Sequence, residues 1–246
     1  MARFFLPRER IQDQRGTVIG EELSHLRKVL RLAPGDHVTV FDDTGWEHEA
    51  VVRSFSADRG DIDILRSCRP DRESSLQITL ALALTKGEKM DWVVEKATEL
   101  GVQTFVPFVS SYTVPKLDDR KMATRIGRWQ RIALSAVKQC GRTAVPRILT
   151  LCELREIVEQ PGTDTLKLFF WERENHLTLK QIYKTKPDSR ALLLVVGPEG
   201  GFSATEAEDA RQHGFELVRL GRRILRAETA ALAAVTVVQF LWGDMG

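Results

Sequence analysis

The stretch Leu-Leu-Leu-Val-Val-Gly-Pro-Glu-Gly-Gly-Phe-Ser, residues 192–203, decides the fold. Its first five residues are aliphatic and do not alternate with polar ones, which predicts a strand buried on both faces of a parallel sheet. The glycines and the proline predict a turn, and Ser203 with Glu206 has the spacing of a capping box, so a helix is expected over residues 203–213. A second apolar run follows at residues 215–220. This order is a βαβ unit, whose ligands collect at the carboxyl ends of the strands.

A second turn follows this unit and mixes apolar with charged residues. Residues 221–230 read Gly-Arg-Arg-Ile-Leu-Arg-Ala-Glu-Thr-Ala, and a last helix is expected over residues 228–242. Apolar side chains in a loop indicate packing or the lining of a pocket. A plain tight turn explains the glycines at residues 197–201 as well as a ligand site does. Neither the dinucleotide fingerprint nor the P-loop is present.

These two turns carry a resemblance to a known family. Gly-Pro-Glu-Gly-Gly-Phe-Ser at residues 197–203 and Leu-Gly-x-Arg-Ile-Leu-Arg-x-Glu-Thr-Ala at residues 220–230 resemble the cofactor-binding region of SPOUT-class methyltransferases. More narrowly, the whole chain is similar to the family that methylates N3 of a uridine in 16S ribosomal RNA. Shorter matches begin at Arg3, His25 and Lys86. The resemblance implies S-adenosylmethionine as the cofactor, the small ribosomal subunit as the partner and a homodimer.

Residues 1–70 are expected to form a small β domain. Val38 and Val40 alternate with polar residues, turns are expected at residues 43–45 and 60–61, and apolar runs follow each turn. Such short strands are typical of a small barrel. A helix over residues 23–32 is expected to pack on it through Leu23, Leu26, Val29 and Leu30. By resemblance, this is the PUA-like β-barrel RNA-binding domain of the family.

Residues 68–75 read as a linker, and residues 75–246 as an α/β domain with a mainly parallel sheet. Strands and helices alternate along it, with strands expected at residues 76–84, 102–108 and 166–171 and helices at 89–100 and 125–140. By resemblance, this is a SPOUT methyltransferase domain that ends in a trefoil knot.

The composition is that of an ordinary globular protein, with 43% hydrophobic and 28% charged residues and a net charge of +2. No apolar run of ~18 residues and no secretory h-region appear, so we expect no membrane contact and a cytoplasmic protein. Three cysteines without C-x-x-C spacing argue against a disulfide framework and against a zinc site, so no metal is expected. The cysteines are expected to be buried as small hydrophobic residues.

The charge distribution is more informative than the total. Residues 120–142 contain seven basic residues and no acidic one, and Arg125, Arg128 and Arg131 lie off an apolar helical stripe. A solvated face explains this pattern, but beside the arginines of the second turn an RNA-phosphate surface is favoured. Lys86 and Lys89 are further candidates for RNA contact.

The resemblance assigns the cofactor pocket to residues of both turns: Gly197, Glu199, Gly200, Gly201, Leu220, Gly221, Ile224 and Leu225. Uracil N3 reacts only after its proton leaves, so the site needs a base or a cation that stabilises the uracil anion. Arg226 is the candidate cation, with phosphate binding as the alternative. Glu228 is the candidate base, or it orients Arg226, or it favours the N-terminus of the last helix. Glu172 is either a ribose contact or an exposed loop acid.

Several alternatives remain open at this stage. A nucleotide-binding α/β enzyme would carry a phosphate fingerprint, a non-catalytic RNA-binding protein would not need both C-terminal motifs, and a 2′-O-methylating SPOUT enzyme is the closer competitor. The last helix carries an apolar stripe that we expect either to pair two subunits or to join a single core, formed by Leu232, Val235, Val238, Gln239 and Trp242.

Overall fold

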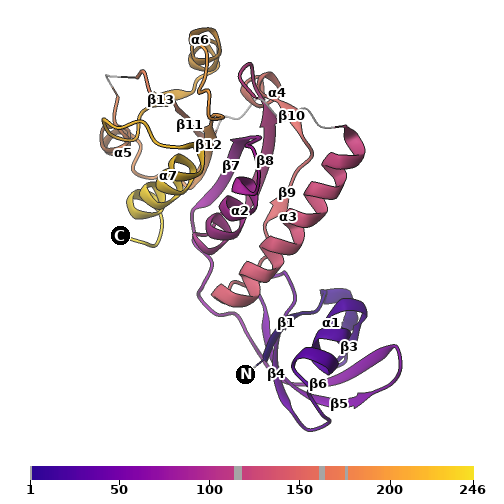
Figure 1. Cartoon of the computed structure of the whole chain (residues 1–246). Coiled ribbons are helices and arrows are strands. Elements are labelled where there is room, and N and C mark those ends of the chain that lie inside the picture. Colours follow the sequence, from indigo (N-terminus) through magenta and orange to yellow (C-terminus); the bar gives the residue numbers. More distant parts are fainter. Residues whose placement is uncertain (1, 114–117, 161–163, 175–176) are drawn as a thin grey trace. The chain divides into compact units, whose positions relative to one another are not determined.

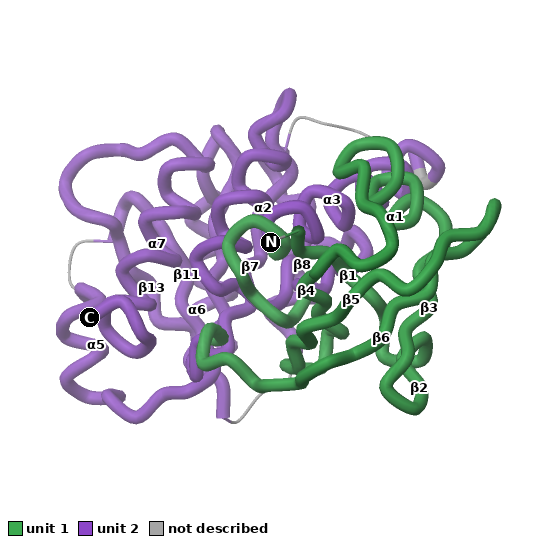
Figure 2. Tube along the Cα trace, turned by 90° about the horizontal axis from the view of Figure 1, so that it is seen from below, with its two compact units in different colours: residues 1–73, 137–145 green, residues 74–136, 146–246 purple. Residues whose placement is uncertain are grey.

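The computed structural model of the chain describes residues 2–113, 118–160, 164–174 and 177–246. The chain divides into two compact units, which Figure 2 colours separately. Unit 1 comprises residues 1–73 and 137–145, and unit 2 comprises residues 74–136 and 146–246. Each unit has a sheet and a hydrophobic core of its own.

Unit 1 is built on a six-stranded mixed sheet. The strand order is β1-β4-β5-β6-β3-β2, in which β1 and β4 pair in parallel and the other neighbours are antiparallel. Val38 and Val40 are fully buried, as their alternation predicts. The strands are β1 Ala2–Phe5, β2 Ile11–Gln12, β3 Arg15–Ile19, β4 His37–Phe41, β5 Glu47–Phe55 and β6 Arg59–Cys68.

The helix of unit 1 differs from the expected one. A short 3-10 helix η1 lies at Arg8–Arg10, then α1 runs over Gly20–Ser24 and continues as a π-helical segment η2 at His25–Val29. Leu23 and Leu26 are buried, but Val29 is 67% exposed, so the expectation that it packs on the core is wrong. The wider π turn adds a residue and rotates the following side chains off the buried face.

The second segment of unit 1 begins inside α3, which runs over Asp119–Cys140. The guanidinium of Arg3 donates hydrogen bonds to the carbonyls of Val137, Gly141 and Arg142, at 2.9, 3.2 and 2.6 Å. The last carbonyls of a helix lack the full set of intrahelical donors, and a cation there also suits the helix dipole. Arg3 therefore ties the end of α3 to the sheet of unit 1.

Unit 2 is an α/β domain with a seven-stranded parallel sheet. Six strands follow the order β10-β8-β7-β12-β11-β13, and β9 pairs with β8. The strands are β7 Gln77–Ala83, β8 Thr104–Val109, β9 Arg147–Ile148, β10 Cys152–Glu153, β11 Leu166–Phe170, β12 Ala191–Val196 and β13 Glu216–Val218. The parallel sheet expected from residues 75–246 is confirmed.

Helices pack against both faces of this sheet (Figure 1). Leu192, Leu194 and Val196 of β12 join the core on one face, while Leu193 and Val195 join the core on the other. This explains why the strand lacks polar residues. The first core includes residues of α2 Lys89–Glu99, α3, α5 Leu179–Thr185 and α7 Ala227–Trp242, and the second includes residues of α4 Leu154–Val158 and α6 Ala204–Gln212.

Helix α7 buries most of the stripe that the sequence offered as a subunit contact. Val235 and Val238 are fully buried and Trp242 is 4% exposed, because they pack in the core of unit 2. Gln239 accepts a hydrogen bond from Ser74 Oγ and donates one to Leu100 O, both at 2.9 Å. A single core therefore absorbs this stripe, and the alternative that it pairs two subunits is wrong for these four residues.

The cysteines are less buried than expected. Cys68 is exposed, whereas Cys140 and Cys152 are half-buried. Burial, followed by the charge of Glu156, raises the pKa of the Cys152 thiol to about 11, so this thiol stays protonated at neutral pH. Among the described helices, none is long and apolar enough to cross a membrane.

Candidate functional site

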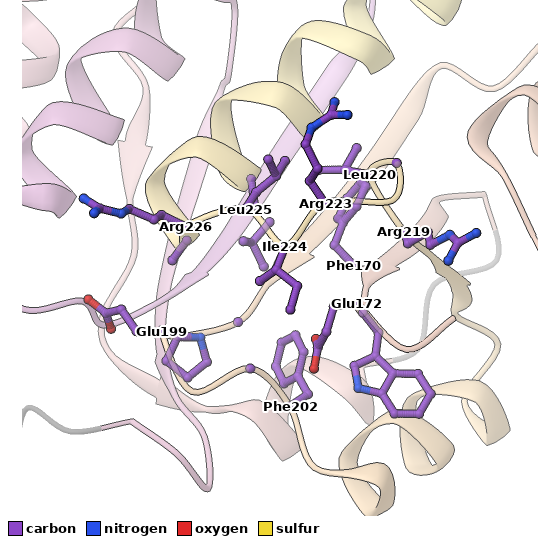
Figure 3. A pocket seen from close by; sticks show the side chains of 18 of the residues that line it. Phe170, Glu172, Glu199, Phe202, Arg219, Leu220, Arg223, Ile224, Leu225 and Arg226 are labelled. Atoms are coloured by element: carbon purple, nitrogen blue, oxygen red, sulfur yellow. The ribbon is translucent and has the colours of Figure 1, made fainter. Parts of the chain in front are cut away.

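A cavity of about 450 Å³ lies where β11, β12 and β13 end (Figure 3). Phe170, Val196 and Val218 line it from the last residues of these strands, and two loops complete its walls. The glycine loop, residues 197–203, follows β12, and the arginine turn, residues 219–226, follows β13. The volume falls within the range of small-molecule sites, about 300–1,000 Å³.

The glycine loop is held by contacts within the protein. Phe202 is 2% exposed, and its ring lies 4.1 Å from that of Phe169. Ser203 caps α6 in a capping box with Glu206, as the spacing predicts. Gly201 has a φ of +70°, and a Cβ there would lie 3.1 Å from an oxygen of Glu172. A larger residue would therefore be strained as well as crowded.

The arginine turn leaves most of its side chains exposed. Ile224 is 85% exposed, and Figure 3 shows its side chain pointing toward Phe202 and Glu172 across the cavity. Within the described residues, the side chains of Arg222, Arg223 and Arg226 make no hydrogen bond or ion pair. An apolar residue that is exposed at the mouth of a cavity indicates a place where a ligand removes it from water.

Three charged side chains meet at the edge of the cavity. Glu199 Oε1 accepts hydrogen bonds from Lys89 Nζ at 2.9 Å and from the backbone N–H of Lys86 at 3.4 Å, and Lys89 Nζ lies 3.4 Å from Glu228 Oε2. The hydrogen bond to Glu199 raises the pKa of Lys89. Burial is the largest single effect on Glu199 and raises its pKa, but the hydrogen bond from Lys89, the backbone N–H groups of Glu199 and Lys86 and the charge of Lys89 together outweigh it, so the pKa of Glu199 is lowered. Lys89 and Glu199 are therefore both charged at neutral pH.

The structure brings together the residues assigned to the cofactor. All eight line the same cavity: Gly197, Glu199, Gly200, Gly201, Leu220, Gly221, Ile224 and Leu225. Arg226 lines it too, as the N-cap residue of α7. Glu228 is not among the lining residues and lies in the first turn of α7, paired with Lys89. These roles stay predictions.

The residues assigned to RNA contact fall into two groups. Arg131 and Lys86 are exposed and Arg125 is half-buried. Arg128 forms an ion pair with Asp91 at 2.6 Å, and Lys89 forms ion pairs with Glu199 and Glu228. Asp91 also accepts a hydrogen bond from the Trp129 indole at 2.9 Å.

Sequence reasoning offered Glu172 as a possible ribose contact but missed the rest of the wall that β11 contributes. Phe170, Trp171 and Glu172 line the cavity from the end of that strand, and Pro198 and Phe202 line it from the glycine loop. The signal was the position of Glu172 just past a predicted strand. Only the sheet order, in which β11 lies between β12 and β13, shows that this strand end borders both turns.

The cavity fits a nucleoside cofactor with apolar and polar parts. Ile224, Leu225 and Phe202 supply apolar walls, and both loops expose backbone groups to the cavity. The indole Nε1 of Trp171 is buried without a hydrogen-bond partner among the described residues. A buried donor of this kind needs an acceptor, which a bound ligand can provide. The described residues contain no cluster of metal-ligating side chains.

Known families match both parts of the chain. A family model described as an RNA methyltransferase domain matches residues 72–239, and one described as an RNA methyltransferase PUA domain matches residues 18–65. The protein named ribosomal RNA small subunit methyltransferase E in Bacillus subtilis is 30% identical over 247 residues, which cover 98% of this chain and 96% of that protein.

Two solved structures are similar along the full length. Ribosomal RNA small subunit methyltransferase E from Neisseria gonorrhoeae, bound to S-adenosylmethionine, has a TM-score of 0.89 and 35% identity, with 100% of both chains covered. A putative methyltransferase from Legionella pneumophila, in complex with the same cofactor, has a TM-score of 0.90 and 32% identity, with 99% of both chains covered.

Proposed function

Because the chain belongs to the ribosomal RNA small subunit methyltransferase E family, we propose that it transfers the methyl group of S-adenosylmethionine to N3 of a specific uridine in 16S ribosomal RNA. The observation that carries the proposal is the cavity at the ends of β11, β12 and β13, where the glycine loop and the arginine turn meet. The cofactor-bound structures of the two similar proteins support it.

The cofactor would be held by the two loops. It supplies an activated methyl group on a sulfonium, which leaves as a neutral thioether. The protein therefore has to bind and orient the cofactor and does not have to activate the methyl group. Backbone groups of residues 197–201 and 220–225 would hold its polar parts, and Ile224 and Leu225 would cover its apolar surface. The Trp171 indole would donate to an acceptor on it, which would satisfy that buried N–H.

Arg226 and Glu228 would prepare the uridine. Arg226 borders the cavity and its guanidinium has no partner among the described residues, so it is available to stabilise a uracil anion. Glu228, two residues further on, would accept the N3 proton. Uracil N3 lies on the Watson–Crick edge, so the target uridine has to be unpaired or splayed out.

The RNA would be a structured part of the small ribosomal subunit, which implies action in the cytoplasm. The net charge of +2 is small, and the basic residues are spread over α3 and the arginine turn. A short RNA would engage few of them and bind weakly, since affinity rises with the number of phosphates contacted. We therefore expect assembled or partly assembled subunits to be methylated and a short hairpin with the same uridine to be methylated poorly.

A second copy of the chain is the further partner that we infer, with the outward side of α7 as the contact. Phe240 of α7 is 61% exposed and Trp92 of α2 is 46% exposed, and both helices belong to unit 2. Large exposed apolar side chains favour a protein contact. Light scattering at micromolar concentration should show a dimer that Phe240→Ser weakens, and a monomeric wild-type protein would refute the dimer.

Calorimetry and label transfer test the function together. Titration of S-adenosylmethionine should show one site per chain, which separates a methyltransferase from a non-catalytic RNA-binding protein. Methyl-labelled cofactor should then transfer its label to small subunits that lack the modification. Binding of ATP without binding of S-adenosylmethionine would indicate a nucleotide-binding enzyme and would contradict the proposal.

A further inference from the structure

Lys89 connects the two elements that carry the proposed chemistry. It begins α2, whereas Glu199 lies on the glycine loop and Glu228 in the first turn of α7. Its ammonium lies 2.9 Å from Glu199 Oε1 and 3.4 Å from Glu228 Oε2. The sequence offered this residue as a candidate for RNA contact, and the structure places its side chain between two carboxylates.

The Glu228 carboxylate is largely buried beside this ammonium. Its side chain is 15% exposed, and its Oε2 atom is buried without a hydrogen-bond partner among the described residues. Among the described residues, Glu228 forms its ion pair with Lys89. The loss of one partner of a part-buried ion pair leaves an uncompensated charge, which is strongly unfavourable.

The neighbouring charges do not replace Lys89. Glu88 and Asp91, on either side of it in the sequence, both face Arg128, at 3.4 and 2.6 Å. Arg226 makes no ion pair within the described residues, and Lys86 reaches Glu199 through its backbone N–H. The cluster therefore consists of one ammonium and two carboxylates, which come from three segments.

We propose that Lys89 is a positioning residue that holds the Glu228 carboxylate in place as the acceptor of the uridine N3 proton. The proposal rests on the proposed function. In the step, the N3–H bond breaks and its electron pair stays on nitrogen, which then bonds to the methyl carbon, while the bond from that carbon to sulfur would break with its electron pair left on sulfur. The proton binds a carboxylate oxygen of Glu228, which becomes neutral and later releases the proton to water.

Lys89 acts through Glu228 and not on the substrate. It is not among the residues that line the cavity, and it is charged at neutral pH, so it cannot accept a proton there. Its second partner, Glu199, anchors it to the glycine loop, and the backbone N–H of Lys86 holds that carboxylate from the other side. Lys89 therefore holds the Glu228 carboxylate at a fixed position relative to the glycine loop that lines the cavity.

The test compares Lys89→Met with a matched control on the same helix. Lys96 also lies between two carboxylates, Glu95 at 2.8 Å and Glu99 at 2.9 Å, but at the other end of α2. The methylation rate of small subunits at saturating cofactor is measured against pH for wild type, Lys89→Met, Lys89→Arg and Lys96→Met. Thermal melts and cofactor titrations accompany each variant.

Lys89→Met should lower kcat by about 100-fold at neutral pH, the order that misplacing a reacting group costs. It should also move the acid limb of the rate profile to higher pH by about one unit, because a carboxylate without its cation takes up a proton more readily. Lys89→Arg should restore most of the rate and the position of the limb. Lys96→Met should match wild type, and cofactor affinity should change far less than kcat.

A failure of the proposed function and a failure of the role of Lys89 give different results. If wild-type protein does not methylate uridine N3 at all, the proposed function fails and the role of Lys89 fails with it. If wild type is active and Lys89→Met keeps the wild-type limb, or loses rate only in proportion to lost folded protein, Lys89 is a structural lysine and this inference alone is overturned.

Discussion

The two loops that wall the cavity are in opposite states. The glycine loop is satisfied within the protein: Phe202 packs on Phe169, Ser203 caps α6 and Glu199 binds Lys89. The arginine turn exposes Ile224 by 85%, and Arg226 has no partner for its side chain among the described residues. The difference indicates that one loop is a preformed wall, while the other keeps exposed groups free to contact a ligand.

The largest expected effect is on chemistry. Arg226→Ala should lower kcat by about 100-fold, the order that loss of a preorganised charge at the reacting group costs. Because the side chain has no partner to lose, the melting temperature should stay unchanged. Ser203→Ala in the glycine loop should do the reverse, with a loss of about 1 kcal/mol of stability and no change in kcat. Steady-state kinetics and thermal melts on both variants measure these effects. A loss of stability in Arg226→Ala, or a loss of kcat in Ser203→Ala, would contradict the difference between the two loops.

The next effect concerns one glycine from each loop. Gly201 and Gly221 both have positive φ, +70° and +75°, but a Cβ at Gly201 would meet Glu172 at 3.1 Å, while one at Gly221 would meet no heavy atom within 4 Å. Val at either position carries strain of about 1–3 kcal/mol. Gly201→Val should therefore weaken cofactor affinity by about tenfold or more, and Gly221→Val by less, as measured by calorimetry. Equal affinities in folded variants would remove the distinction between the loops.

Ile224 tests whether the exposed turn closes on the cofactor. Ile224→Ser should reduce cofactor affinity by about 1–2 kcal/mol, the value of burying part of an aliphatic side chain on binding, and leave the melting temperature of the free protein unchanged. Leu65, 55% exposed in unit 1, gives the matched control Leu65→Ser. Unchanged affinity in Ile224→Ser would mean that the side chain stays in water.

A smaller effect is expected at the basic face of α3. Changing Arg125, Arg128 and Arg131 to Ala together should flatten the salt dependence of subunit methylation while leaving cofactor affinity alone. Each phosphate contact contributes about one to the slope. Because Arg128 pairs with Asp91, we expect a loss of about two rather than three. Wild-type salt dependence in the triple variant would make α3 a solvated face.

The smallest effect is on stability against pH. The folded-state pKa of Glu199 is lowered, so its contribution is present above its unfolded value and is lost as pH falls through the folded value. The pKa of Lys89 is raised, so its contribution is present below 10.5 and is lost as pH rises beyond it. Thermal melts of wild type and Glu199→Gln should differ slightly at neutral pH and converge in acid. A constant difference across that range would contradict the ion pair.

Much of the site could be predicted from the sequence because the patterns that indicate it involve residues close together in the chain. The five-residue aliphatic run predicted β12, the pair Ser203 and Glu206 predicted the start of α6, and all eight residues assigned to the cofactor line one cavity. Each depends on neighbours in the sequence: unbroken hydrophobicity, cap spacing and glycines after a strand. The trefoil knot stays a prediction, since periodicity carries no information about threading.

What the sequence did not predict depends on contacts between distant segments. Phe170 and Trp171 border the cavity because β11 lies between β12 and β13 in the sheet. Lys89 meets carboxylates that follow it by more than a hundred residues. The stripe of α7 would be apolar whether it paired two subunits or packed in the core of unit 2. Its burial and the hydrogen bonds of Gln239 to Ser74 and Leu100 show that it faces the core.

The central claim is methyl transfer to uridine N3, and nucleoside analysis measures it most directly. Small subunits that lack the modification are incubated with the protein and methyl-labelled S-adenosylmethionine, and the RNA is digested to nucleosides for mass spectrometry. The account predicts a single labelled product, N3-methyluridine, about one per subunit, which Arg226→Ala greatly reduces. A label on 2′-O-methylated nucleosides, or on any base other than uracil, would contradict it.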